Sequence, residues 1–285
     1  MWRASSINTM TIHYRTHTTK NLIWISDIHL DMVHDDVKRR FLDKLANARC
    51  DAVLITGDIS SSEYLVAHLT EISHACGSTP CFFVPGNHDY FGSSFAMVDQ
   101  AIADLCARHR NLIALGHGEI IELSRNTALV GCRGWYDGQA GAGAQTKVKS
   151  SDRYLINDFR NLDWARYFEK LRMLGNESAA YFRRILPMAL TRYSTVLVGT
   201  HIPICTQVLR HGGTFCELDR QPYFSNRSAG NAIVGISRNF SGRHIVVYAG
   251  HSHCFAEFSL SSNLEIRVAG AQRGFPTFQP MITID

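Results

Sequence analysis

The stretch that decides the fold is NLIWISDIHL at Asn21–Leu30, in which a short apolar run ends in two polar residues separated by one position. A similar run, again ending in polar residues, recurs in AVLITGD at Ala52–Asp58 and in CFFVPGNHD at Cys81–Asp89. Runs of this length fit buried β-strands, and the segment 37–48 between two of them carries apolar residues at helical spacing. This alternation of strand and helix predicts a mainly parallel sheet built from βαβ units.

The remainder of the chain predicts a second sheet and two more helices. Further strands are expected at Leu112–Leu115, Ile120–Leu123, Thr127–Gly131, Thr195–Gly199, His244–Ala249, Cys254–Leu260 and Leu264–Val268. The last of these follow one another closely, which is typical of hairpins. The helices are expected at Leu162–Leu174 and Glu177–Arg192, with Pro187 bending the second. The predicted architecture is a β-sandwich flanked by helices.

We expect residues 1–20 to be a flexible tail, with Met10 as an alternative start of translation. The basic residues, Ser and Thr of this segment also fit a transit peptide. No internal repeat or low-complexity linker divides residues 21–285, which we expect to form one domain with a helical insert near 161–192.

Composition and charge restrict the function classes. The chain has 29 Lys and Arg against 25 Asp and Glu, so its formal charge of +4 accommodates anionic substrates without requiring a nucleic-acid partner. Its eight cysteines include no C-x-x-C pair, which favours buried thiols in a reducing compartment. No apolar run reaches the roughly 20 residues that span a bilayer, and no secretory apolar region opens the chain, so a cytoplasmic location is expected.

Polar side chains follow five of the predicted strands at the point where each strand ends. The five motifs are Asp27-Ile28-His29, Gly57-Asp58, Gly86-Asn87-His88-Asp89, Gly199-Thr200-His201 and Gly250-His251-Ser252-His253. In open α/β sheets, sites gather beyond the carboxyl ends of the strands, so these motifs can converge. One such motif alone fits ordinary hydrogen-bonded structure. All five favour a metal site, because buried carboxylates and imidazoles are costly unless they are paired or metal-bound.

In this order the five motifs resemble those of the calcineurin-like metallophosphoesterase family, and the match extends from Asp27 to His253. The resemblance implies a four-layer α/β/β/α sandwich with two mixed sheets and a metal site at the carboxyl ends of the strands. It implies one metal ion held by Asp27, His29, Asp58 and His253, and a second held by Asp58, Asn87, His201 and His251. Asp58 would bridge the two ions.

The chemistry expected of this ligand set is hydrolysis of a phosphate ester. Oxygen and nitrogen ligands without a thiolate fit Mn²⁺, Fe²⁺ or Fe³⁺, Zn²⁺ or Co²⁺ and do not choose among them. Two such ions favour attack by a metal-bridging hydroxide on a phosphodiester or a small phosphomonoester, a nucleotide for example. By resemblance, His88 assists the leaving group, and Asp89 orients and polarises His88.

Departures from the family pattern narrow the substrate. The protein phosphatase branch usually has an Arg shortly after the bridging Asp, whereas Ile59-Ser60-Ser61 follows Asp58 here. This difference argues against protein phosphatase activity, and the resemblance is to the branch that contains phosphodiesterases and small-molecule phosphatases. The alternatives left open are a nuclease acting on DNA or RNA and a catalytically silent scaffold that binds proteins. Nucleic acid is not favoured, because the segment after Val268 is too short for a DNA-binding extension. Oligomeric state is not predicted.

The loops above the metals are expected to set substrate choice. Trp135 and Tyr136 follow a predicted strand, and their rings are candidates for stacking on a base or an apolar leaving group. The alternative is that both rings pack the loop. His211, in the long loop after His201, is a further candidate for the substrate rim. The helical insert fits a lid, a dimer surface or core, and core is favoured.

Overall fold

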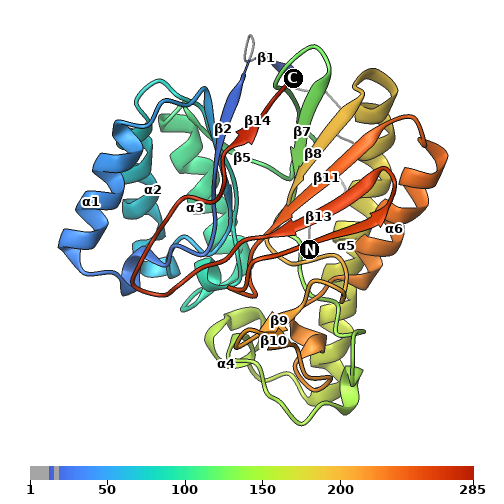
Figure 1. The fold of residues 1–285 in the computed structure, drawn as a ribbon. Helices are drawn as coiled ribbons and strands as arrows, with labels where there is room; N and C mark the ends of the chain where they lie inside the picture. The colour runs from blue at the N-terminus through green and yellow to red at the C-terminus, as the bar shows by residue number, and fades with distance from the viewer. Residues whose placement is uncertain (1–12, 16–18) are drawn as a thin grey trace.

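The computed structural model describes residues 13–15 and 19–285, arranged as two β-sheets packed face to face with helices outside (Figure 1). The first sheet has the strand order β14-β2-β3-β4-β5. Its members are β2 (Asn21–Ile25), β3 (Ala52–Thr56), β4 (Cys81–Val84), β5 (Leu112–Ala114) and β14 (Ile282–Thr283). Strands β2 to β5 pair in parallel, and β14 adds an antiparallel edge to β2. Three helices alternate with these strands, namely α1 (Asp35–Ala46), α2 (Ser62–Cys76) and α3 (Phe95–Arg108).

The second sheet has the order β1-β6-β7-β8-β11-β13-β12. Its members are β1 (His13–Arg15), β6 (Ile120–Glu122), β7 (Thr127–Gly131), β8 (Thr195–Gly199), β11 (His244–Ala249), β12 (Ala256–Ser261) and β13 (Leu264–Val268). The pairs β6–β7 and β12–β13 are antiparallel, and the others are parallel, so the sheet is mixed. Helices α5 (Trp164–Arg192) and α6 (Arg227–Asn239) cover its outer face (Figure 1).

The interior between the sheets is filled by one apolar cluster with side chains from both, among them Trp24, Leu54, Phe82, Leu197 and Tyr248. Two further clusters lie between each sheet and its own helices. Burying apolar area on both faces of each sheet explains why the strands read as continuous apolar runs rather than as alternating patterns. The predicted mixed α/β fold with two sheets and outer helices is confirmed.

The predicted break between the two helices of the insert does not occur. Trp164–Arg192 is a single α-helix of 29 residues that contains Pro187. Gly175 lies where the break was expected, and a Cβ added there would collide with Asp137. Close packing against the loop after β7 therefore outweighs the low helix propensity of glycine at this position.

A small subdomain, which we call the cap, lies beyond the carboxyl ends of β7 and β8 (Figure 1). It comprises residues 132–163 and 202–226, with the short helix α4 (Asp152–Leu155), the ribbon β9 (Arg210–His211) and β10 (Thr214–Phe215), and the 3₁₀ turns Gly143–Gln145, Asn157–Phe159 and Gln221–Tyr223. The two chain segments are joined by hydrogen bonds, such as those from Ala142 N to Leu218 O (2.9 Å) and from the Tyr223 hydroxyl to Val148 O (2.8 Å).

Part of the predicted N-terminal tail is ordered in the fold. His13–Arg15 forms β1, which pairs in parallel with β6. Met10 and the rest of the predicted tail lie outside the described residues. All eight cysteines are free thiols. In the part of the chain that the structure describes, no helix has the length and apolar character of a membrane span.

Candidate metal centre

The five polar motifs meet at one edge of the sandwich, because β2, β3 and β4 are parallel neighbours in one sheet and β8 and β11 are parallel neighbours in the other. Backbone hydrogen bonds tie adjacent strand ends together. Asp27 N donates to Gly57 O and His29 N donates to Asp58 O, both at 3.0 Å, and Gly250 N donates to His201 O at 2.9 Å. The prediction that these segments converge is confirmed.

Five of the predicted ligands have left-handed backbone conformations. Their φ angles are 53° at Asp27, 40° at His29, 52° at Asp58, 71° at His251 and 57° at His253. Only one other non-glycine residue in the described ranges has a positive φ. Such conformations cost of order 1–3 kcal/mol each and cluster at functional sites. The positive φ angles thus coincide with the residues whose side chains gather at the centre.

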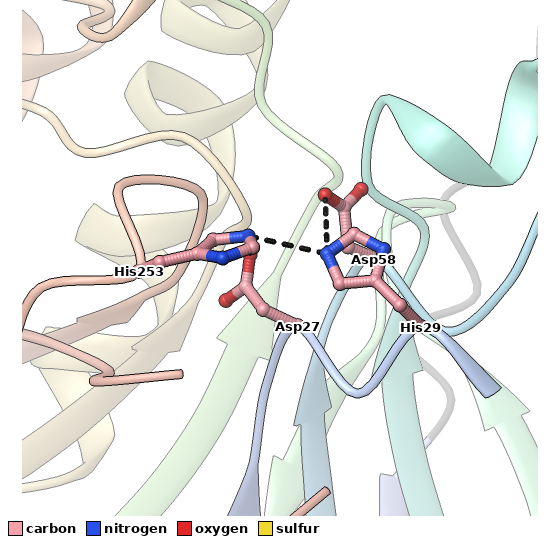
Figure 2. Close-up of side chains that lie close together, drawn as sticks. All are labelled: Asp27, His29, Asp58 and His253. Carbon is pink, nitrogen blue, oxygen red and sulfur yellow. Dashed lines mark hydrogen bonds and ion pairs between the residues drawn. The ribbon is translucent and has the colours of Figure 1, made fainter. Parts of the chain in front are cut away.

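The first ligand group consists of Asp27, His29, Asp58 and His253, whose ligand atoms all lie within 4.8 Å of one another (Figure 2). His29 Nε2 is 3.1 Å from His253 Nε2 and 3.7 Å from Asp58 Oδ2. His253 Nε2 is 3.3 Å from Asp27 Oδ1. Nitrogen and oxygen donors from both sheets thus point into one small volume.

The second ligand group consists of Asp58, His201 and His251, again within 4.8 Å, together with the amide of Asn87. Asn87 Oδ1 is 3.0 Å from His201 Nε2 and 2.9 Å from His251 Nδ1. Asp58 belongs to both groups. Its Oδ1 is 3.3 Å from His201 Nε2 and its Oδ2 faces His29, so one carboxylate presents an oxygen to each group.

The outward ring nitrogens of two histidines are bound to backbone carbonyls. His201 Nδ1 is 2.8 Å from Thr56 O, and His251 Nε2 is 2.8 Å from Tyr223 O. A ring N–H donates to a carbonyl, so in the neutral imidazole the inward nitrogen keeps its lone pair. This arrangement is typical of metal-ligating histidines.

The two ligand carboxylates are also held by donors. Asp27 accepts from Ser26 Oγ at 2.5 Å and from His251 N at 2.8 Å. Asp58 Oδ1 accepts from His88 N at 2.9 Å. These bonds restrict the rotation of both carboxylates before any ion binds.

Electrostatics keeps Asp58, His29 and His251 in forms that can bind a cation. Burial alone would raise the pKa of Asp58, but charge attraction from His201 and His88 holds it well below its usual value. Burial lowers the pKa of His29 to about 4 and that of His251 to about 3. His201 differs, because Asp58 overcomes the effect of burial and raises its pKa to about 9.

The residues present fit a metal ion at the second group. Because His251 is neutral and its Nε2 donates to Tyr223 O, its Nδ1 carries a lone pair. That atom nevertheless lies 2.9 Å from Asn87 Oδ1, which is another acceptor. Two acceptors at this distance repel unless a cation lies against both. Imidazole, carboxylate and amide donors without a thiolate are typical of first-row divalent ions.

His88 lies beside the centre and is partly exposed. Its Nε2 is 4.0 Å from Asp58 Oδ2, and its side chain is 13% exposed. The ring packs between Phe91, at 4.2 Å between centroids, and His29, at 4.5 Å. The structure therefore brings His88 next to the ligand groups and leaves one side open to solvent.

Asp89 is placed differently from the prediction that it polarises His88. Its Oδ1 accepts from the backbone N–H groups of Ile59 and Ser60, at 2.9 and 2.8 Å, and its Oδ2 accepts from Gly86 N at 2.7 Å. Within the described residues, no hydrogen bond joins Asp89 to His88. Burial, followed by repulsion from Asp58, raises the pKa of Asp89 to about 8. The carboxyl group ties the loop after β3 to the loop after β4.

The two candidate stacking residues are also placed differently from the prediction. Trp135 is 1% exposed and Tyr136 is 0% exposed, so neither ring offers a face to a substrate. Trp135 packs edge-on against Phe95 at 5.0 Å. Trp135 packs inside the cap against Phe159, and Tyr136 contacts Tyr223 of the cap and the Tyr167 hydroxyl of α5. The alternative, that they pack the loop, fits the structure.

His211 is exposed on β9, at the rim of the cap. Its ring lies 6.1 Å from that of Phe224, which in turn lies 4.9 Å from that of His251. One aromatic ring therefore separates His211 from the second ligand group, and its place at the rim is compatible with contact to a bound substrate.

Two residues near the centre were missed by sequence reasoning. Asp152 of α4 accepts from Asn87 Nδ2 at 3.1 Å, although no motif marks it. Arg273 lies in an exposed turn, and Ala271 N of the same loop donates to His253 O at 3.0 Å. Burial lowers and Asp27 raises the pKa of His253, and the nearby charge of Arg273 opposes the rise. In the sequence, Arg273 is a single basic residue before a glycine, and no motif around it indicates a role at the centre.

Comparison with known proteins agrees with this geometry. The family model of the calcineurin-like phosphoesterases matches residues 20–255. No curated protein matches the chain. A dimetal phosphatase from Danio rerio has a similar fold, with a TM-score of 0.54, 13% identity, and coverage of 88% of this chain and 87% of that one.

Two further structures were found with lower scores. A protein of Thermus thermophilus gives a TM-score of 0.47 with 14% identity, covering 89% of this chain and 90% of that one. A 5'-nucleotidase from Candida albicans gives 0.45 with 12% identity, covering 91% of this chain and 47% of that one.

Proposed function

Because the chain belongs to the calcineurin-like phosphoesterase family, we propose that it hydrolyses a phosphodiester or a small phosphomonoester with two divalent ions at the candidate metal centre. The observation that carries the proposal is the placement of Asp58. Its two oxygens face two separate groups of nitrogen and oxygen donors, and each group is compact enough for one ion. When bound, two ions would activate water and neutralise the charge of the phosphoryl group.

The chain's own residues would orient the reaction. Asp27, His29 and His253 would hold one ion, Asn87, His201 and His251 the other, and Asp58 both. Asp89 would act as a positioning residue, because it fixes the loops that carry Asp58 and Asn87.

His88 is proposed to donate a proton to the oxygen of the leaving group. Its Nε2 lies 4.0 Å from the carboxylate shared by the two ligand groups, and the ring is held by Phe91 and His29. Its partial exposure leaves room for a leaving group beside the ring. A positioned imidazole typically contributes roughly 10²–10⁴-fold to such a step.

Arg273 is proposed to contact the anionic substrate. In the described part of the chain it makes no ion pair, it is exposed, and its loop is fixed to His253 by the bond from Ala271 N. The loop after Asp58 offers no cation of its own, because its residues Ile59, Ser60 and Ser61 are uncharged. Because the charge of Arg273 acts on His253, we expect this side chain to attract an anionic substrate to the first ligand group.

The test is hydrolysis of an aryl phosphodiester and an aryl phosphomonoester by protein loaded with Mn²⁺. We expect at least one of them to be cleaved, and Asp58→Asn prepared in parallel controls for contaminating phosphatases. Nucleotides, cyclic nucleotides, sugar phosphates and single- and double-stranded DNA then identify the substrate class. Protein that binds two ions and cleaves none of these compounds would support the protein-binding scaffold instead.

A further inference from the structure

We infer that Asp152 of the cap is a positioning residue that turns the Asn87 side chain so that its oxygen faces the second ligand group. The inference rests on the proposed dinuclear centre and concerns how one of its ligands is oriented. Asn87 Nδ2 donates to Asp152 Oδ1 at 3.1 Å, and both residues are buried, with 4% and 2% of their surfaces exposed.

The orientation of Asn87 follows from hydrogen-bond chemistry. A side-chain amide has one acceptor oxygen and one donor nitrogen, whereas an ionised carboxylate only accepts. Nδ2 must therefore face Asp152, which leaves Oδ1 beside His201 Nε2 and His251 Nδ1. A flipped amide would set its oxygen against the carboxylate and offer a metal ion an N–H group.

Asp152 is itself held in place by a second buried contact. The Tyr136 hydroxyl donates to Asp152 Oδ2 at 2.6 Å, and it also lies 3.3 Å from the Tyr167 hydroxyl. Each carboxylate oxygen thus has its own donor, and rotation of the carboxylate would break both bonds. Tyr136 therefore acts on Asn87 through Asp152, and its ring also lies 6.2 Å from that of His251.

The contact also crosses between structural units. Asn87 follows β4 in the first sheet, whereas Asp152 belongs to α4 in the cap, 65 positions along the chain. A separate bond fixes the same part of the cap to α3, because Phe95 N donates to Asp158 Oδ2 at 2.8 Å. Asp152 and Asp158 are thus two cap carboxylates that both face the first sheet, of which one touches a ligand.

The experiment is calorimetric titration of Mn²⁺ into metal-free protein, which requires no substrate. We expect the wild type to bind two ions. Asp152→Ala should lower the affinity for the second ion by about 10–100-fold, as is typical when an outer partner of a metal ligand is lost. The affinity for the first ion should not change. Asp152→Asn can still accept from Asn87 Nδ2 through its own oxygen and should recover most of that loss.

Two further variants separate orientation from folding. Tyr136→Phe keeps the packing and removes one hydroxyl, so it should weaken the second ion by less than Asp152→Ala does. Asp158→Asn is the matched control, because it alters the neighbouring cap contact and should leave both ions unchanged. Thermal unfolding of each metal-free variant shows whether the cap remains packed.

The possible results lead to distinct conclusions. If Asp152→Ala binds two ions as the wild type does, the inference is wrong and the proposed function stands. If Asp158→Asn lowers the affinity for the second ion as much as Asp152→Ala does, cap packing is responsible and the inference is wrong. If Asp152→Asn binds the second ion as poorly as Asp152→Ala does, the charge of Asp152 is responsible and the inference is again wrong. If the wild type does not bind two ions, the proposed function fails and the inference with it.

Discussion

The two ligand groups share Asp58 but are supported by different parts of the molecule. The first group is held by neighbouring strand-end residues, since Asp27 accepts from Ser26 Oγ and from His251 N. The second group depends on the cap. Tyr223 of the cap binds the outer nitrogen of His251, and Asp152 of the cap binds Asn87. We conclude that a disturbance of the cap should act on the second ion and spare the first.

The largest effect on both groups is expected from Asp58→Asn, which removes the residue that they share. We expect both ions to be lost and turnover to fall by at least about a thousandfold, because several kcal/mol of transition-state stabilisation disappear with the ions. Metal analysis after gel filtration, alongside steady-state kinetics, measures both effects. Two ions retained at wild-type affinity would show that Asp58 does not bridge the groups.

His88→Ala separates chemistry from metal binding in both groups at once. His88 donates its backbone N–H to Asp58, and this bond survives the substitution. Both ions should remain, while kcat falls by about 10²–10⁴-fold, as expected for loss of a proton donor. Esters with more acidic leaving groups should be less affected. Loss of the ions in this variant would place His88 among the ligands.

Gly175→Ala probes the cap from its contact with α5. A Cβ at this position would collide with Asp137 Cβ and lie 3.3 Å from Asn226 Oδ1. Overpacking should lower the free energy of unfolding by about 1–3 kcal/mol. Chemical denaturation measures that loss. Metal titration should show that the affinity for the second ion falls more than the affinity for the first. An equal loss of affinity for both ions would contradict the division between the groups.

The smallest expected effect is that of Arg273→Ala, which removes a charge beside the first group without removing a ligand. An exposed charge contributes about 0.2–1 kcal/mol, so KM should rise up to about fivefold while kcat changes little. The rise should shrink at high salt, because exposed charges are screened. Arg238→Ala, which removes an exposed charge on α6, is the control. A KM equal to that of the wild type would remove Arg273 from the substrate site.

The features predictable from sequence are those with local causes. The run Leu22–Ile25 marks a strand wherever it lies, and the polar residues at 27 and 29 follow its end. Parallel pairing then dictates that such ends meet at one edge. Five motifs and two sheets could be derived in this way. The burial of each run also follows from its composition.

The features that sequence reasoning missed depend on contacts between distant residues. Asp152 lies in a polar segment without periodicity. Its role depends on the hydrogen bond from Asn87, which lies 65 positions away in the sequence. The sequence does not tell whether the ring of Tyr136 is exposed or buried, because its burial depends on contacts with the distant residues Tyr167 and Tyr223. Asp89 is the last residue of a polar motif, yet its side chain accepts hydrogen bonds from backbone amides of the loop after β3.

Five residues of the metal centre combine a strained backbone with a side chain that the site requires, so stability and function conflict there. They are Asp27, His29, Asp58, His251 and His253, all with left-handed conformations. Glycine adopts such conformations without steric penalty, and it would relax the backbone at each of these positions while deleting a ligand. Aspartate and histidine are among the non-glycine residues that adopt this region more often than others, yet neither does so as freely as glycine. In the metal-free chain, glycine in place of one of these histidines would relieve backbone strain, whereas the loss of ring contacts and the greater freedom of glycine in the unfolded chain would oppose that gain. The backbone at these five positions therefore favours glycine, whereas a metal centre requires their side chains.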